Sequence, residues 1–136
     1  RDLFAVTNIY EHQDRPERVE QQLIEIFRHE PAYQGLYITS ASSIIACPLL
    51  MEINKDKRVK VIATDLFPQI KAPLDEGVVT ATIFQNPFLQ GRKAVDSIYR
   101  FLRNEPRGDT IKIAPQIVMR SNIGLYHINE QSKAEP

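Results

Sequence analysis

Two polar side chains end β-branched apolar runs, and their chemistry suits a small polar ligand. Asp65 follows the run at residues 59–64, and Gln85 follows the run at residues 78–84. A carboxylate accepts two hydroxyl hydrogen bonds at once, and charge-assisted bonds are the stronger kind. An amide adds one acceptor and two donors, so the pair could bind the edge of a polyol. Alternatively, Asp65 only bonds the backbone amides of its own turn.

The elements around this pair predict how it is positioned. Pro68 and Pro87 follow the two runs closely, as expected where a buried strand turns into a helix of an open α/β sheet. The carboxyl ends of parallel strands share one edge, so Asp65 and Gln85 should lie together on it although they are twenty positions apart.

Four strand–helix units alternate along the chain, with strands expected at residues 3–7, 35–39, 59–64 and 78–84. Right-handed crossovers then predict an α/β fold with a three-layer, doubly wound, all-parallel sheet of the Rossmann-like kind. We expect the strand order 2-1-3-4, with a last extended piece around Pro115 at the far edge.

Helix boundaries are marked by capping residues. Asp14 predicts a helix start, Gly77 a helix end, and Asn86 followed by proline a second start. The helix after Asn86 carries an apolar stripe at helical spacing, which we expect to face inward. Its members are Phe88, Gly91, Val95, Ile98 and Leu102.

Three further residues are candidates for the same rim. Ser40 follows the second strand and serves either the ligand or a helix cap. Phe67 could cover the apolar face of a sugar, a role open also to Phe84, although strand alternation places Phe84 in the core. Tyr10 follows the first strand, and with Asn8 it is a candidate of the same kind.

Composition excludes several functions. The 136 residues have 43% hydrophobic and 25% charged content and zero formal net charge, so no global basic footprint for nucleic acid is present. No apolar run has membrane-spanning length. The three histidines lack partners at metal-ligand spacing, and Cys47 is expected to be a buried helix residue. We therefore expect no metal and no cofactor. The sequence also lacks the G-x-S-x-G motif that would indicate a hydrolase.

The segment from Asp65 to Gly91 resembles the type I periplasmic-binding-protein fold. That group contains the sugar-binding proteins of ABC importers and the sensor domains of LacI-type transcriptional regulators. Its pattern of a strand ending in Asp, a strand ending in Gln, then Pro and a helix with Gly is matched by Asp65, Gln85, Pro87 and Gly91. Ser40 and Ala41 stand where the family has an Asn-Asp pair.

The resemblance implies that residues 1–122 form the carboxyl-terminal lobe of a sugar effector-binding domain and that residues 123–136 form a crossing segment and polar tail. The first lobe and a DNA-binding headpiece would precede Arg1. The implied protein is a cytoplasmic, non-enzymatic LacI-type regulator that closes on a small sugar and contacts DNA only through its headpiece. A homodimer is expected through the apolar segments at residues 66–74 or 44–53.

Two alternatives remain open at this point. The first is the same lobe in the periplasmic or extracytoplasmic sugar-binding protein of an ABC importer. The second is a phospho-receiver domain with Asp65 as the acceptor. A receiver also needs an acidic pair after its first strand, where this chain has Thr7 and Asn8, and a lysine after a fifth strand.

Overall fold

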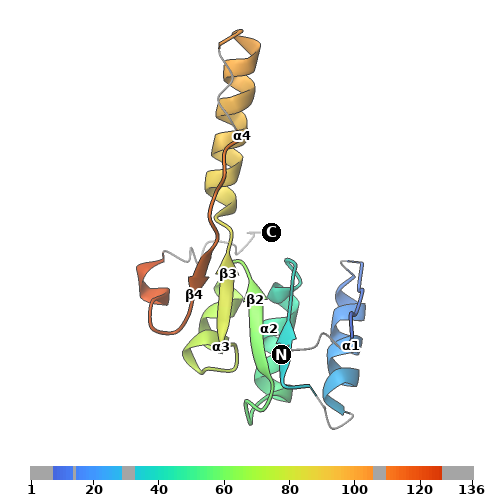
Figure 1. Cartoon of the computed structure of the whole chain (residues 1–136). Coiled ribbons are helices and arrows are strands. Elements are labelled where there is room, and N and C mark those ends of the chain that lie inside the picture. Colours follow the sequence, from blue (N-terminus) through green and yellow to red (C-terminus); the bar gives the residue numbers. More distant parts are fainter. Residues whose placement is uncertain (1–7, 14, 29–32, 106–109, 127–136) are drawn as a thin grey trace, which may run out of the picture.

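A four-stranded sheet with the order β1-β2-β3-β4 forms the centre of the fold (Figure 1). The computed structural model describes residues 8–13, 15–28, 33–105 and 110–126. The strands are β1 (Gly35–Tyr37), β2 (Lys60–Thr64), β3 (Ala81–Phe84) and β4 (Gln116–Val118). The helices are α1 (Pro16–Arg28), α2 (Ser43–Ile53), α3 (Lys71–Asp75) and α4 (Pro87–Leu102), with short 3-10 turns η1 (Pro68–Ile70) and η2 (Ile123–Leu125).

The first three strands are parallel, as expected. Leu36 of β1 lies beside Val61 of β2, and Ala63 of β2 lies beside Thr82 of β3. The α/β fold with a mostly parallel sheet flanked by helices is therefore confirmed. The strand expected at residues 3–7 and the helix start at Asp14 lie outside the described residues.

Two details of the predicted sheet are wrong. The strand at residues 35–37 pairs directly with β2, so no other strand separates the two as the order 2-1-3-4 requires. Periodicity identifies strands but does not determine which strands are neighbours. The sheet is also not all parallel, because β4 runs antiparallel to β3. The chain leaves β3 at the carboxyl edge, passes through α4 and re-enters the sheet from that same edge, which reverses its direction (Figure 1).

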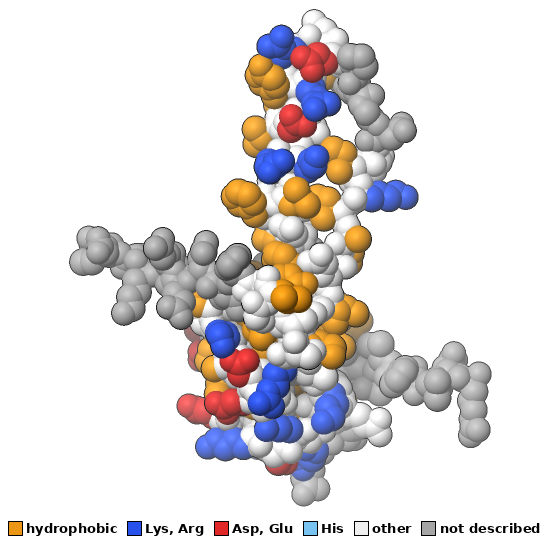
Figure 2. All heavy atoms as spheres, turned by 90° about the vertical axis from the view of Figure 1, so that its left-hand side faces the viewer, with side chains coloured by type: hydrophobic (Ala, Val, Ile, Leu, Met, Phe, Trp, Pro, Cys, Tyr) orange, Lys and Arg blue, Asp and Glu red, His pale blue; other side chains and the backbone are white. Residues whose placement is uncertain are grey.

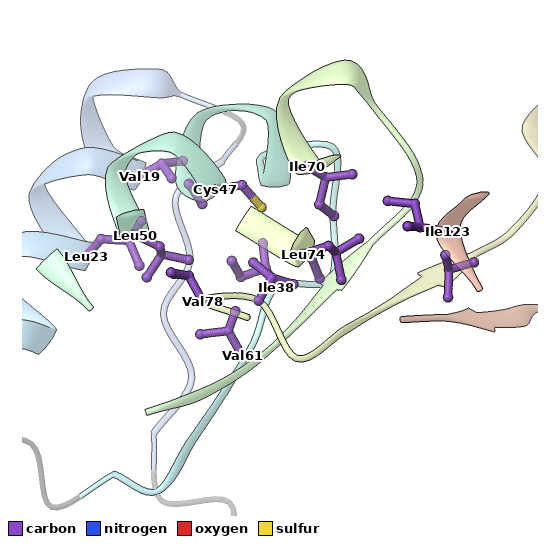
Figure 3. Packing of buried hydrophobic residues seen from close by; sticks show 14 residues of the cluster. Val19, Leu23, Ile38, Cys47, Leu50, Val61, Ile70, Leu74, Val78 and Ile123 are labelled. Carbon is purple, nitrogen blue, oxygen red and sulfur yellow. The ribbon is translucent and has the colours of Figure 1, made fainter. Parts of the chain in front are cut away.

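The core lies between one face of the sheet and the helices α1, α2 and α3 (Figure 3). Val61 of β2 packs in one cluster with Leu50 and Cys47 of α2 and Leu74 of α3, and none of these four side chains is exposed. On the other face of the sheet Tyr37, Ile62 and Ile117 remain exposed. We call the sheet with α1, α2 and α3 the body of the chain. The stability of the body therefore comes from one buried layer.

Gly77 and Asn86 mark helix ends at the positions that the sequence predicts. Gly77 follows α3 with φ +74°, and its N–H donates to the carbonyl of Leu74 at 3.0 Å. Asn86 precedes α4, and its side-chain oxygen accepts from the N–H of Leu89 at 3.1 Å. After α2, the buried Asn54 side chain donates to the Val59 carbonyl at 2.8 Å and accepts from the Val59 N–H at 3.3 Å.

The helix α4 projects away from the body (Figure 1). None of its described residues is buried, and it has no extensive contact with another described helix or strand. The prediction that its apolar stripe faces inward is thus wrong for this chain. Phe88 is 82% exposed and Leu102 is 72% exposed. Helical spacing identifies an apolar face, but it does not establish that the covering surface belongs to the same segment of chain.

The body extends beyond the boundary at residue 122. Ile123 is buried in the core cluster, and the ring of Tyr126 meets that of Phe84 edge-on at 5.7 Å. Residues 123–126 were expected to belong to a crossing segment and polar tail, but these two apolar side chains anchor them. The rest of that tail lies outside the described residues.

Candidate functional site

Asp65 occupies the carboxyl end of β2 in a left-handed conformation, with φ +65°. Its N–H donates to the Ile83 carbonyl at 2.9 Å, and its carbonyl accepts from the Thr82 hydroxyl at 2.7 Å. Asp tolerates this conformation better than most residues, but it still costs free energy. These two hydrogen bonds to β3 thus hold the backbone of Asp65 at the rim.

The structure brings Asp65 and Gln85 together, as the sequence predicts. One carboxylate oxygen, Oδ1, accepts from the backbone N–H of Gln85 at 3.1 Å. The Gln85 carbonyl in turn accepts from the side-chain amide of Gln90, in the first turns of α4, at 2.8 Å. Asp65 is half-buried and Gln85 is exposed. Asp65 therefore bonds a backbone amide and also lies on the rim. Its other carboxylate oxygen, Oδ2, remains available to accept a further hydrogen bond.

Ser40 lies in a turn that is bonded to the end of β2. Its hydroxyl oxygen accepts from the Ser42 N–H at 3.3 Å, and its carbonyl accepts from the Ser43 hydroxyl at 3.0 Å. The Ser43 hydroxyl oxygen also accepts from the Thr64 N–H at 3.2 Å, one residue before Asp65. Ser40 is thus close to the rim and half-buried, and its hydroxyl bonds locally near the start of α2.

Tyr10 is placed elsewhere. Its hydroxyl lies 3.1 Å from the hydroxyl of Tyr33, two residues before β1, and Asn8 also bonds Tyr33. The hydrogen bond with Tyr33 raises the pKa of Tyr10 above its usual value. Among the described residues no hydrogen bond or ring contact joins Tyr10 to Asp65 or Gln85. The structure thus links Tyr10 to the amino end of β1, opposite the rim.

The two aromatic candidates have different environments. Phe67 is half-buried two residues after Asp65, with its carbonyl accepting from the Ile70 N–H at 3.0 Å. Phe84 is turned to the core side, where it meets Tyr126. Phe67 therefore remains the aromatic candidate of the two, because Phe84 is used in the core.

Sequence analysis missed two sets of residues near this rim. Thr64 and Thr82 are buried polar residues whose hydroxyls donate to backbone carbonyls just beyond the neighbouring strands. Thr64 donates to Ile38 after β1, and Thr82 donates to Asp65 itself. A threonine at or near the end of a buried strand is the signal that could have identified them. His12 was considered only as a metal ligand, but its Nδ1 lies 3.4 Å from the Ser42 hydroxyl, and no signal in the sequence predicts this contact.

Other chemistry finds little support in the described part of the chain. No cluster of His, Cys, Asp or Glu there could hold a metal ion. Burial raises the pKa of the Cys47 thiol to about 12, which disfavours a nucleophilic thiolate. None of the described helices combines the length and apolar content needed to cross a bilayer.

One of the two predicted dimer surfaces is largely buried in the core of the chain itself. In the segment at residues 66–74, Ile70, Pro73 and Leu74 are buried in the core. They cover the sheet next to α2, so they are not available as an apolar patch for a partner. The segment at residues 44–53 keeps Ile44 exposed.

A mostly parallel sheet flanked by helices, with polar groups on the carboxyl rim, defines a Rossmann-like α/β lobe. The chain belongs to the family of periplasmic binding protein domains, which matches residues 3–106. No curated protein sequence matches the chain.

Solved structures show the same fold. An ABC transporter solute-binding protein from Agrobacterium vitis with bound D-fucose is 18% identical, with a TM-score of 0.77 over 94% of this chain and 42% of that chain. A second such protein from A. vitis, bound with α-D-tagatopyranose, is 19% identical, with a TM-score of 0.77 over 88% of this chain and 40% of that one.

A LacI-type transcriptional regulator from Bacteroides fragilis, described as putative, is 23% identical, with a TM-score of 0.67 over 79% of this chain and 38% of that chain. The chain therefore spans about two-fifths of the length of these proteins. At these identities the likeness establishes the fold, an α/β lobe like those of periplasmic binding proteins and consistent with a three-layer arrangement.

Proposed function

We propose that this chain is one lobe of a two-lobed, non-enzymatic receptor for a sugar-like small molecule. The observation that carries the proposal is the pairing of Asp65 and Gln85 on the carboxyl rim. Ligands of open α/β sheets bind at this edge. The Asp65 carboxylate accepts hydroxyl hydrogen bonds, the Gln85 side chain offers an acceptor and two donors, and Phe67 provides an apolar surface beside them.

A sugar hydroxyl at Asp65 would meet a carboxylate that is already oriented. The N–H of Gln85 occupies Oδ1 of Asp65, so a ligand would use Oδ2 without first ordering the carboxylate. Solved structures of the same fold are described with D-fucose, α-D-tagatopyranose and myo-inositol bound. A second lobe would supply the opposite wall, and closure of the two lobes would exclude water from the ligand.

The isolated chain should therefore bind sugars weakly. With half of the hydrogen bonds and one wall of the cleft, we expect millimolar or weaker dissociation constants, about 4 kcal/mol or less of binding free energy. NMR titration with D-fucose and myo-inositol would show shifts confined to the residues around Asp65 and Gln85. Micromolar affinity of the 136-residue chain for any sugar would contradict the one-lobe proposal.

A charge test separates ligand binding from folding. Asp65→Asn keeps an oxygen for the Gln85 N–H and a residue that tolerates positive φ, but it removes the negative charge. We expect sugar binding to weaken about tenfold with the thermal midpoint nearly unchanged. Asp56→Asn is the matched control, because Asp56 lies before β2 at the opposite edge of the sheet. Equal sugar affinity of Asp65→Asn and Asp56→Asn would refute the site.

More specifically, we propose that this lobe belongs to the effector-binding domain of a LacI-type transcriptional regulator. Support comes from the resemblance of the Asp65–Gly91 segment and from the similar B. fragilis structure. In this proposal the protein is cytoplasmic and dimeric, and it meets DNA through a separate headpiece. The helix segment at residues 44–53, with Ile44 exposed, is the remaining candidate for the dimer contact.

A second candidate is the extracytoplasmic sugar-binding protein of an ABC importer. Several of the similar structures are ABC transporter solute-binding proteins, which favours this alternative. Sedimentation of the native polypeptide at tens of micromolar distinguishes the two. A dimer supports the regulator, whereas a strict monomer supports the importer.

A further inference from the structure

The strand β4 forms an outer edge of the sheet in the described part of the chain, next to β3. Alternate residues of a strand present their N–H and C=O groups to opposite neighbours. The carbonyl of Ile83 accepts from the N–H of the residue that follows β2, so Ile83 faces β2 and Phe84 faces β4. Phe84 lies opposite Gln116. By the same alternation, Ile117 and Met119 present their backbone groups to the free edge.

A free sheet edge is a template for a further strand, because its backbone groups can pair with another chain. The side chains at this edge are apolar and lie in water, with Ile117 65% exposed and Met119 43% exposed. Figure 2 views the molecule from the side on which β4 and η2 lie, and it shows hydrophobic side chains on the surface below α4. The edge of β4 therefore has the composition that favours addition of a strand.

The side chain of Asn122 already occupies this edge. Its Nδ2 donates to the Ile117 carbonyl at 3.1 Å, and its Oδ1 accepts from the Met119 N–H at 2.7 Å. A carboxamide offers the same kinds of donor and acceptor as a peptide group. Asn122 thus bonds two backbone groups of the free edge as an added strand would bond them.

The turn after β4 holds Asn122 in this position. The Met119 carbonyl accepts from the N–H groups of Asn122 at 3.1 Å and Ile123 at 3.0 Å. The side chain of Ile123 is buried in the core cluster, which fixes the turn to the body beside β4 (Figure 1). On the other side of β4, Pro115 has no N–H to offer to an added strand. The edge is therefore closed at both ends of the strand.

We propose that Asn122 is an edge plug, whose carboxamide prevents a second copy of the chain from adding its own β4 to this edge. An edge strand can pair antiparallel with its equivalent across a two-fold axis, and every copy carries the same edge. Such pairing would place Ile117 and Met119 of the two copies side by side. The inference is independent of the ligand, because it follows from the hydrogen bonds at β4.

Removal of the carboxamide tests the edge plug. We expect Asn122→Ala to self-associate at a concentration roughly tenfold or more below that needed by the wild type, because pairing then satisfies two open backbone groups. Sedimentation of the 136-residue chain from micromolar to millimolar concentration measures this difference. Ser121→Ala is the matched control, because Ser121 is exposed in the same turn and takes no part in the bonds to β4. Equal self-association of all three proteins would overturn the proposal.

Amide exchange in dilute solution tests the plug within a single molecule. The Met119 N–H should exchange about tenfold or more faster in Asn122→Ala, because its acceptor has gone, whereas the amides of α2 should be unchanged. Asn122→Ser is a milder variant in which a shorter hydroxyl cannot bond both groups, and it keeps the comparison possible if the alanine variant does not fold. Unchanged exchange of Met119 in the folded variant would show that Asn122 does not close the edge.

A second substitution locates the contact between the copies. Ile117→Lys in the Asn122→Ala background should restore the sedimentation behaviour of the wild type, because a lysine on an edge strand opposes pairing with its equivalent. Tyr37→Lys is the control, since Tyr37 is also exposed on this face of the sheet but lies in β1. Self-association that survives Ile117→Lys, or that Tyr37→Lys abolishes equally, would place the contact elsewhere and overturn the proposal.

Discussion

The body and α4 contain similar apolar side chains but use them differently. Leu50 in α2 is fully buried, whereas Leu102 at the end of α4 is 72% exposed. Both residues lie in helices that are flanked by strands of one sheet. The difference is whether the helix packs on the sheet, as α2 does next to Val61 and Leu74, or projects beyond it, as α4 does (Figures 1 and 3).

This difference separates what the chain stabilises by itself from what it presents to other surfaces. The buried layer of α2, α3 and the sheet provides the free energy of folding for the body. The rim, with Asp65 and Gln85, and the exposed apolar stripe of α4 contribute little to that layer. We therefore expect substitutions in the two regions to affect different measurements.

The largest expected effect comes from paired leucine truncations in the 136-residue chain. Leu50→Ala leaves a cavity in the core and should lower the free energy of unfolding by about 2 to 5 kcal/mol. Leu102→Ala should change it by less than about 0.5 kcal/mol, because the side chain is already in water. Urea denaturation followed by circular dichroism measures both. Similar losses would show that α4 packs against this body in solution.

The buried thiol of Cys47 gives the body a specific pH dependence. Burial raises its pKa from 9.0 to about 12, so the folded state holds the proton where the unfolded state has lost it. The stabilisation is complete below pH 9 and is lost as the pH rises from 9 towards 12. At pH 11 the wild type should have lost about 2 to 3 kcal/mol relative to its own value at pH 8.

Cys47→Ala removes the titrating group and is the reference for this measurement. The variant should lack this component of the pH dependence when both proteins are unfolded with urea between pH 8 and pH 11. Parallel stability curves for the two proteins would show that the thiol is accessible to solvent, contrary to its burial.

Next in size is the connection between α2 and β2. The Asn54 side chain satisfies both the N–H and the carbonyl of Val59, and all of these groups are buried. Asn54→Ala should cost about 1 to 3 kcal/mol, because two backbone groups lose their partners. Glu52→Ala, at an exposed position of the same helix, is the control and should be nearly neutral. A neutral Asn54→Ala would indicate that water replaces the side chain.

Sequence signals correctly predicted the features of the fold that depend on residues close together in the chain. Gly77, with positive φ, and Asn86, with a helix-capping side chain, are at the predicted element ends. The adjacency of Asp65 and Gln85 followed from strand periodicity and the shared carboxyl edge of parallel strands. The ligand role of these two residues remains a prediction.

The errors concern interactions between segments that are distant in sequence. The apolar stripe of α4 has the pattern of a buried face, but helical periodicity carries no information about what covers it. Tyr10 was placed on the rim because it follows an expected strand, whereas the structure pairs it with Tyr33. The antiparallel direction of β4 depends on the path of the chain through α4, which no short motif in β4 encodes.

The smallest expected effect is at the polar face of α4. Asp96 precedes Arg100 by one helical turn, in the favourable orientation for an ion pair, but both side chains are about half exposed to water. Asp96→Asn should lower the thermal midpoint of α4 unfolding, followed by circular dichroism at low salt, by an amount equivalent to about 0.3 to 0.5 kcal/mol. The effect should vanish at about 1 M salt, where screening is nearly complete. Because α4 makes little contact with the body, the urea midpoint of the body should stay unchanged in the same variant. A shift of that midpoint would show that α4 and the body unfold as one unit.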